Sequence, residues 1–287
     1  DQKHEYKKTE KIRAFGFVVP ALLWTVAFFV IPFAVMIVLS LAHLEGRDVV
    51  QTFDLGNYVR IFSEPSLVKG IVVSLEITFV VTIVSVLLAW PLAWIIAMQV
   101  PKKWQRLAIM FAILPFWTSY VVRSYSWALV LGENGVIMQT LIGIGILDEP
   151  FQIMATRTAT IIGFVHFFVM LLTLTIYSNL VQLSPNYWRA AQDLGASVWN
   201  TMRLVIVPLT LPGIMTGAFL TFVLCIGDYI TPQILGGGNE LTMPQLIMLQ
   251  LGRRGDFPMA SALSIVLMCI VTLAYFASAR WLKMERV

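Results

Sequence analysis

The chain has 287 residues, of which 58% are hydrophobic and only 13% are charged, and its mean hydropathy is +0.80. Soluble domains are about 45–50% apolar and about 25% charged, so this composition excludes an ordinary soluble protein and predicts a membrane protein. The net charge of +4 comes from basic residues at the ends of apolar runs, not from one patch, which argues against a nucleic-acid-binding protein. The chain begins at Asp1 and not at Met, so we expect further residues before it.

Six stretches are apolar and long enough to cross a bilayer, which takes about 20 mostly apolar residues. They predict an all-α, polytopic membrane protein with one transmembrane domain, residues 15–287, after a tail at residues 1–14. The expected spans are residues 15–42, 68–100, 107–131, 158–181, 204–235 and 259–282. In the fifth span we expect interruptions at Pro208 and at Pro212-Gly213, because proline lacks a backbone donor.

Lys and Arg gather on one side of these spans. The side that holds both termini carries thirteen basic and five acidic residues, and the other side carries six basic and nine acidic residues. Cytoplasmic loops are enriched in Lys and Arg, so both termini and the stretch 184–208 are expected in the cytoplasm. An even number of spans agrees with two termini on one side.

Residues 184–208 are the most polar stretch in the second half of the chain and predict two short helices with a break between them. Ser184 is a good N-cap, and Pro185 suits the first helical position. Gly195 can end the first helix with a positive φ, and Ser197 can cap the second.

Apolar residues recur at helical spacing through this stretch and predict one face of a helix. They are Tyr187, Ala190, Ala191, Leu194 and Val198. The two alanines would let a partner surface approach closely. By pattern alone, this face fits either a helix that rests on the membrane surface or a docking helix for a cytoplasmic partner.

Nothing in the sequence predicts an enzyme. The histidines are scattered at positions 4, 43 and 166, no serine lies in a nucleophile elbow, and no Walker sequence is present, so ATP hydrolysis is not expected in this chain. Cys225 and Cys269 lie in apolar runs and are expected to be buried small hydrophobes, without a metal site. His166 is expected to be a packed, hydrogen-bonded residue.

The stretch 184–208 resembles the EAA loop of the permease subunits of ABC importers. The resemblance is carried by Ala190-Ala191, by Gly195 after three more residues, and by Ile206-Val207-Pro208 after a further ten. The 92 residues after Gly195 leave room for two spans, as in that family. LPFWTSYVVRSYSWALVL (residues 114–131) and AAQDLGAS (residues 190–197) are similar to the spermidine/putrescine-type branch, specifically its first permease subunit. One residue departs from the pattern: Arg189 stands where the family usually has Glu.

The resemblance implies a multi-subunit importer in the bacterial inner membrane. Its partners would be a second permease subunit, two ABC ATPase subunits that bind the ATP, a periplasmic solute-binding protein and membrane lipid, with no nucleic acid and no cofactor in this chain. The solute would be a polyamine or a related cation, with an opine, an amino-acid-like or another small solute as alternatives. Access would alternate by rigid-body rocking. The residues implied in coupling to the ATPase are Tyr187, Arg189, Ala190, Ala191, Asp193, Leu194 and Gly195.

Ionisable side chains inside the spans are candidates for the solute pathway, because an intramembrane charge costs about 2.5–3.5 kcal/mol on insertion scales. Glu76, Arg123 and Asp228 are such residues. Either Arg123 forms an ion pair with one of the two acids and fixes helix packing, or the acids line a route for a cation. Asp228 is our preferred residue, because Gly227 and Pro232 loosen the helix around it and a carboxylate beside an aromatic suits an ammonium group. The pathway candidates are Asp228, Glu76, Arg123, Tyr229, Trp117 and Tyr120.

Two other classes of protein remain open. A self-sufficient secondary transporter or channel is the first, although we find no inverted repeat and the loop 184–208 resembles a docking element. A membrane scaffold without a transport role is the second, and the intramembrane charges argue weakly against it.

Overall fold

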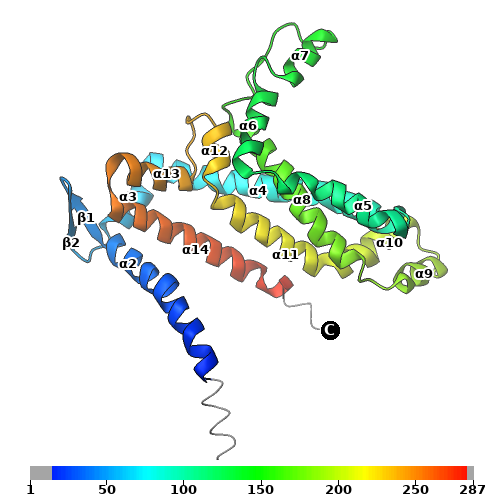
Figure 1. The fold of residues 1–287 in the computed structure, drawn as a ribbon, viewed down its shortest axis with the longest axis horizontal. Coiled ribbons are helices and arrows are strands. Elements are labelled where there is room, and N and C mark those ends of the chain that lie inside the picture. Colours follow the sequence, from blue (N-terminus) through cyan, green and yellow to red (C-terminus); the bar gives the residue numbers. More distant parts are fainter. Residues whose placement is uncertain (1–14, 283–287) are drawn as a thin grey trace, which may run out of the picture. The chain divides into compact units, whose positions relative to one another are not determined.

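The computed structural model describes residues 15–282, so the tail expected at residues 1–14 lies outside the described residues. The described chain divides into two compact units. One comprises residues 15–63 and 247–266, and the other comprises residues 64–246 and 267–282. Each unit is helical, apart from one short hairpin (Figure 1).

The first unit begins with a helix from Phe15 to Ser40, which includes a π-helical turn (Val26–Val30) and α2 (Ile31–Ser40). Two strands follow, β1 (Ala42–Glu45) and β2 (Asp48–Gln51), which pair antiparallel. After them come α3 (Gly56–Ser63), a π-helical turn (Gln250–Arg254) and the first part of α14 (Phe257–Leu282). The hairpin, whose turn uses Gly46 at a φ of 65°, is not among the elements predicted from the sequence.

The second unit contains the candidate functional residues. Its helices are α4 (Pro65–Trp94), α5 (Lys102–Ile113), α6 (Tyr120–Leu131), α7 (Val136–Gly143), α8 (Arg157–Leu180), α9 (Pro185–Asp193), α10 (Val198–Thr201), α11 (Val207–Ile226) and α12 (Ile230–Leu235). Shorter turns are the π-helical Ile95–Gln99 and Met202–Ile206 and the 3-10 turn Leu114–Trp117. Helix α13 (Met243–Leu249) begins in this unit and ends in the other.

The centre of the second unit is made by α4, α8 and α11. Helix α4 packs along α8, and α11 packs against both (Figure 1). Glycines on α11 let α8 approach closely: a Cβ at Gly217 would lie 2.7 Å from the Leu172 side chain, and one at Gly213 would meet Asn179. Small residues spaced by four are a common way for membrane helices to pack. Gly213, the residue after Pro212, therefore allows α8 and α11 to pack closely.

The helices account for five continuous candidate spans and one bent pair. The continuous ones are Phe15–Ser40, Pro65–Gln99, Arg157–Leu180, Val198–Ile226 and Phe257–Arg280. The third expected span, residues 107–131, is not one helix, because Lys102–Trp117 and Tyr120–Gly143 meet at 90°. The 3-10 turn at Pro115 is followed by Thr118 and Ser119 in extended conformations, which end one helix and start the next.

The expected interruptions in the fifth span are wrong. The helix continues through Pro208 and Pro212 and ends only at Ile226. The π-helical turn before Pro208 already departs from the regular pattern of backbone bonds, so the missing N–H of this proline is tolerated. The Thr216 hydroxyl donates to the Pro212 carbonyl over 2.9 Å. The break comes instead at Gly227–Tyr229, before α12.

Candidate solute pathway and coupling loop

Asp228 lies in the break between α11 and α12. Its Oδ1 accepts a hydrogen bond from the Ile230 N–H (2.8 Å), and its Oδ2 accepts one from the Thr231 N–H (3.3 Å). Asp is a preferred residue at a helix start because its oxygens satisfy backbone donors that have no partner within the helix. The local sequence thus fixes the carboxylate at the start of α12.

Tyr120 joins this carboxylate to α6. Its hydroxyl donates to Oδ2 of Asp228 and accepts a hydrogen bond from the Thr231 hydroxyl over 3.1 Å. Asp228 and Tyr120 are both half-buried. Asp228 and Tyr120, two of the predicted pathway residues, are therefore in contact. Hydrogen-bond donors surround the carboxylate.

Arg123 lies over the face of the Tyr120 ring. Only 7% of its surface is exposed, and its Cζ lies 5.0 Å from the centroid of the Tyr120 ring and 4.5 Å from that of Phe167. Within residues 15–282, Arg123 forms no ion pair, so the pairing with Glu76 or Asp228 that the sequence left open does not form. Contact with two ring faces stabilises the cation in its place.

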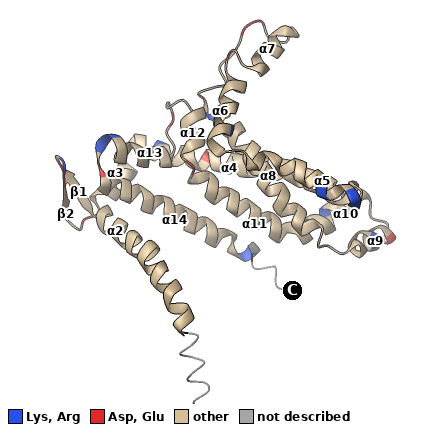
Figure 2. Ribbon diagram, in the orientation of Figure 1, with Lys and Arg blue, Asp and Glu red and all other residues tan. Residues whose placement is uncertain are grey.

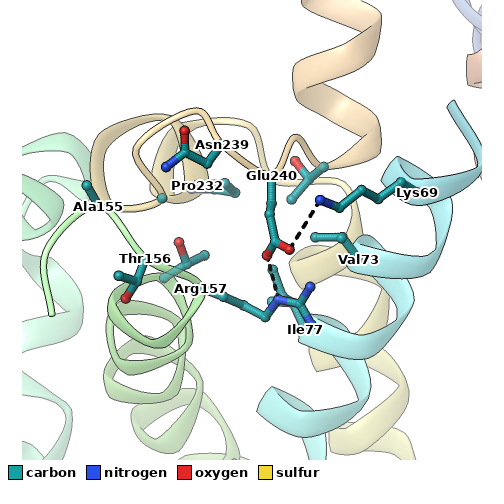
Figure 3. A pocket seen from close by; sticks show the side chains of 12 residues that line it. Lys69, Val73, Ile77, Ala155, Thr156, Arg157, Pro232, Asn239 and Glu240 are labelled. Atoms are coloured by element: carbon teal, nitrogen blue, oxygen red, sulfur yellow. Dashed lines mark hydrogen bonds and ion pairs between the residues drawn. The ribbon is translucent and has the colours of Figure 1, made fainter. Parts of the chain in front are cut away.

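Glu76 lies elsewhere and pairs with Arg157. Arg157, Glu240 and Lys69 line a pocket of about 370 Å³ (Figure 3). Arg157 is at the centre of a network of charges: its Nη1 pairs with Glu76, and its Nε donates to Oε2 of Glu240 over 2.9 Å. Lys69 approaches the other oxygen of Glu240, Oε1, at 3.5 Å. The network connects α4, α8 and the loop after α12.

Two features hold this loop and its acid in place. Gly237 has a φ of 72°, and a Cβ there would collide with Ala155, so the loop lies against the start of α8. The hydrogen bond from Arg157 lowers the pKa of Glu240, and the positive charges of Arg157 and Lys69 add to this effect while burial opposes it. Glu240 is therefore held as a carboxylate.

The three aromatic residues predicted for the pathway do not all lie together. Tyr120 belongs to the Asp228 cluster, Tyr229 is half-buried beside it in the chain, and Trp117 is 80% exposed and outside the cluster. Thr231 and Phe167 are not among the residues predicted from the sequence. The position of Thr231 three residues after Asp228 is a capping signal that could have identified it. Phe167 gives no such signal, because its role depends on which face of α8 meets α6.

The loop 184–208 has the caps that its sequence predicts. The Ser184 Oγ accepts from the Asn186 N–H (3.3 Å) with Pro185 as the first residue of α9, and the Ser197 Oγ accepts from the Asn200 N–H (3.2 Å). Gly195 has a φ of 80°, which favours glycine. The predicted helix, break and second helix are confirmed.

The faces of α9 differ from the prediction at one position. Six of the residues proposed for coupling are exposed: Tyr187, Arg189, Ala190, Asp193, Leu194 and Gly195. Ala191 is buried, at 7% exposed. It lies three residues after Trp188, which packs into the core near Trp94 with a centroid distance of 6.5 Å. The prediction of one face with both alanines is therefore wrong, since Ala191 belongs to the inner face.

Basic residues gather at this end of the second unit. Arg189 and Lys102 line a cavity of about 670 Å³ between α9 and the start of α5. Figure 2 shows blue segments at the neighbouring ends of α5 and α10. The start of α5 and the start of α9, which the sequence assigned to the same side of the membrane, thus lie together.

Comparison with known families decides the class of the protein. Residues 78–284 match the family described as binding-protein-dependent transport system inner membrane component. The chain belongs to this family. It is a transmembrane permease of an ABC importer, and its family is one of multi-pass inner-membrane proteins.

Individual relatives agree with this assignment. The permease is 31% identical over 264 residues to the spermidine/putrescine transport system permease protein PotB of Salmonella typhimurium, with 91% of each chain covered. It is 31% identical to PotB of Escherichia coli over 91% of this chain and 95% of that one. It is also 32% identical over 175 residues to the inner membrane ABC transporter permease protein YdcU of Escherichia coli, over 56% of this chain and 55% of that one.

Solved structures show the same fold. A chain of a bacterial alginate ABC transporter, crystallised with an alginate-bound periplasmic protein, superposes with a TM-score of 0.78, 16% identity and coverage of 97% and 98% of the two chains. A chain of the MetNI methionine ABC transporter gives a TM-score of 0.60, 18% identity and coverage of 77% and 98%. At these identities, the likeness concerns the fold alone.

Proposed function

We propose that this permease forms one half of the translocation pathway for small solutes that carry primary ammonium groups, namely a polyamine such as spermidine or putrescine or a related cation. The observation that carries the proposal is the Asp228 carboxylate, which the backbone of α12 and the Tyr120 hydroxyl hold at a break between two helices. An intramembrane carboxylate attracts a cation and is expensive to keep without a function. The names of the relatives support the same solute class.

The proposed complex contains a second permease subunit, two ABC ATPase subunits that bind ATP, and a periplasmic solute-binding protein. In this arrangement, the loop 184–208 and both termini face the cytoplasm, where α9 receives the movement of an ATPase. Leu194 (88% exposed) and Trp199 (72% exposed) are large apolar side chains of this loop that a partner protein could cover. Arg189 would place a positive charge at that contact, where a matching acid on the ATPase is expected.

The proposed cycle uses the rigidity of the second unit. Packing of α4, α8 and α11 lets a push on α9 move these helices together. The break at Gly227–Tyr229 keeps the Asp228 carboxylate free of a regular helix, so that it can face a solute. ATP hydrolysis on the partner subunits would then reset the permease.

The test is uptake in proteoliposomes that contain the complete importer, with its binding protein outside and ATP inside. We expect labelled putrescine to accumulate only when ATP, the binding protein and both permeases are present. The permease alone should show no uptake driven by proton or sodium gradients. Robust uptake by this chain alone would make it a secondary transporter or channel, and ATP-driven uptake of other solutes without polyamines would overturn the solute class.

A further inference from the structure

A smaller pocket of the second unit, with a volume of about 220 Å³, lies beside the Asp228 cluster and has no assigned role. It is lined by Arg123, His166, the hydroxyl residues Thr118 and Ser126, and by Pro115, Trp127 and Val130. Trp127 is one helical turn after Arg123 on α6, and His166 precedes Phe167 on α8. Tyr120 therefore has the Asp228 carboxylate at its hydroxyl and the Arg123 pocket at its ring face.

Arg123 is a cation in the wall of this pocket, and most of its N–H groups have no hydrogen-bond acceptor among the described residues. It is more than nine-tenths buried, and the hydrogen bond that its guanidinium makes within residues 15–282 is a long one, 3.4 Å from Nη1 to the Pro115 carbonyl. A guanidinium carries five N–H donors, and ring faces do not accept the ones on its edge. Burying a charge is unfavourable without a partner that neutralises it. Among the described residues no carboxylate forms an ion pair with this guanidinium, and the nearby Asp228 carboxylate is hydrogen-bonded to Tyr120 instead.

His166 adds a donor of its own. The Trp127 indole N–H, which can only donate, donates to Nδ1 of His166 over 3.0 Å. Nδ1 is therefore the acceptor of a neutral imidazole, and the ring proton is on Nε2. Within the described part of the chain, Nε2 has no hydrogen-bond partner. Among the described residues no acidic side chain lines the pocket, and Arg123 and His166 both offer N–H groups to it.

We propose that this pocket binds a carboxylate group of the solute, with the Arg123 guanidinium and the His166 Nε2–H as its donors. The solute class would then include amino-carboxylates whose ammonium end is attracted to Asp228 and whose carboxylate end enters the Arg123 pocket. A guanidinium matches a carboxylate with two parallel hydrogen bonds, which a diamine cannot use. The pocket can hold several water molecules at about 30 Å³ each, so a carboxylate with a short carbon chain fits. This inference rests on the proposed function, because it assumes that Asp228 meets an ammonium group.

The test compares three probes of equal carbon number, 4-aminobutyrate, butylamine and butyrate, on the complete importer in lipid nanodiscs without the binding protein. We expect 4-aminobutyrate to bind at least about tenfold more tightly than butylamine, as one charge-assisted bidentate contact would give. Arg123→Gln should reduce this affinity ratio to about one. The control Arg106→Gln removes the same charge from an exposed position on α5 and should leave the ratio unchanged.

A pair of variants at His166 separates binding from packing. His166→Asn keeps an acceptor for Trp127 but lacks the donor at the Nε2 position, so the affinity ratio should fall. His166→Gln can place an amide N–H near that position and should retain more of the ratio. If both variants lower the ratio and the melting temperature in parallel, His166 is only a packing residue and the proposed donor pair is wrong.

Two results would overturn the proposal. If the wild-type importer binds 4-aminobutyrate no better than butylamine, the pocket does not take a carboxylate, while putrescine uptake would still uphold the proposed function. If Arg123→Gln weakens assembly with the second permease and leaves the ratio unchanged in the complexes that form, the anion is an acid of that subunit. Arg123→Lys, which keeps the charge but loses the bidentate geometry, gives the same comparison should the glutamine variant not fold.

Discussion

At Asp228 a single carboxylate has two tasks, since it starts α12 and places a negative charge beside Tyr120. Asp228→Asn removes the charge but keeps one side-chain oxygen, which can still accept from the Ile230 N–H. We expect ATP-driven putrescine uptake to fall at least about tenfold, a loss of about 1.4 kcal/mol or more of interaction with the cation, while the yield of assembled complex changes little. Uptake and complex yield are measured on the same preparations.

Asp148→Asn is the matched control, since Asp148 is an exposed residue of the loop after α7. It should change neither uptake nor yield. If Asp228→Asn lowers assembly and uptake together, the carboxylate serves helix packing and not the solute.

Glu240 gives a prediction about pH. Its pKa is lowered below the ordinary glutamate value of about 4.3, chiefly by the hydrogen bond from Arg157. A lowered pKa means that the folded state gains stability above that ordinary value and loses it as the pH falls through the lowered pKa. Glu240→Gln should thus reduce the melting temperature by about 1–4 °C at pH 7, a range set by what partly exposed ion pairs contribute.

The difference between wild type and Glu240→Gln should stay constant from pH 7 to about pH 5 and shrink below that, as the wild-type carboxyl becomes protonated. Thermal unfolding of the detergent-solubilised protein over this pH range is the measurement. Glu133→Gln, in an exposed loop, should follow the wild type at every pH. A difference that grows toward low pH would contradict the assignment.

At the scale of elements, Gly195 separates α9 from α10 with a φ of 80°, and apart from its chain neighbours no atom of the described residues lies within 4 Å of the place that a Cβ would take. Gly195→Asp thus strains the backbone by about 1–2 kcal/mol and adds a charge at the proposed ATPase contact without disturbing a core. We expect ATP hydrolysis to continue while solute uptake falls at least about tenfold. Both rates are measured on reconstituted importer.

Gly145→Asp is a suitable control for this variant. Gly145 also has a positive φ, 75°, and open space around it, but it follows α7 on the opposite side of the predicted topology. It should leave the ratio of uptake to hydrolysis unchanged. If Gly195→Asp also leaves this ratio unchanged, the loop takes no part in coupling.

The same loop shows which features could be predicted from local sequence and which could not. Ser184, Pro185, Gly195 and Ser197 determine helix starts and ends through their own backbone and side-chain chemistry, so they could be assigned without a structure. Which side of α9 is buried could not be assigned in this way. It depends on the indole of Trp188, whose packing partner Trp94 lies on a distant helix.

At the scale of the whole molecule, the spans keep much apolar surface exposed. None of the residues in the apolar window of Phe15–Ser40 is buried, and only half of those in the window of Arg157–Leu180 are. Lipid or other subunits of the importer must cover this surface, because every spanning helix satisfies its backbone internally but needs an apolar environment for its side chains.

The sequence by itself determined the all-α membrane class, the six apolar stretches and the helix–glycine–helix loop, because hydropathy, length and capping are local properties of consecutive residues. Tertiary structure alone decided the partners of the intramembrane charges. Glu76 meets Arg157, Asp228 meets Tyr120, and Arg123 meets the ring of Phe167, all through contacts between segments that are far apart in the chain. Such contacts follow from which faces of α4, α6, α8 and α12 pack together, and side-chain packing between distant segments leaves no periodic signal in the sequence.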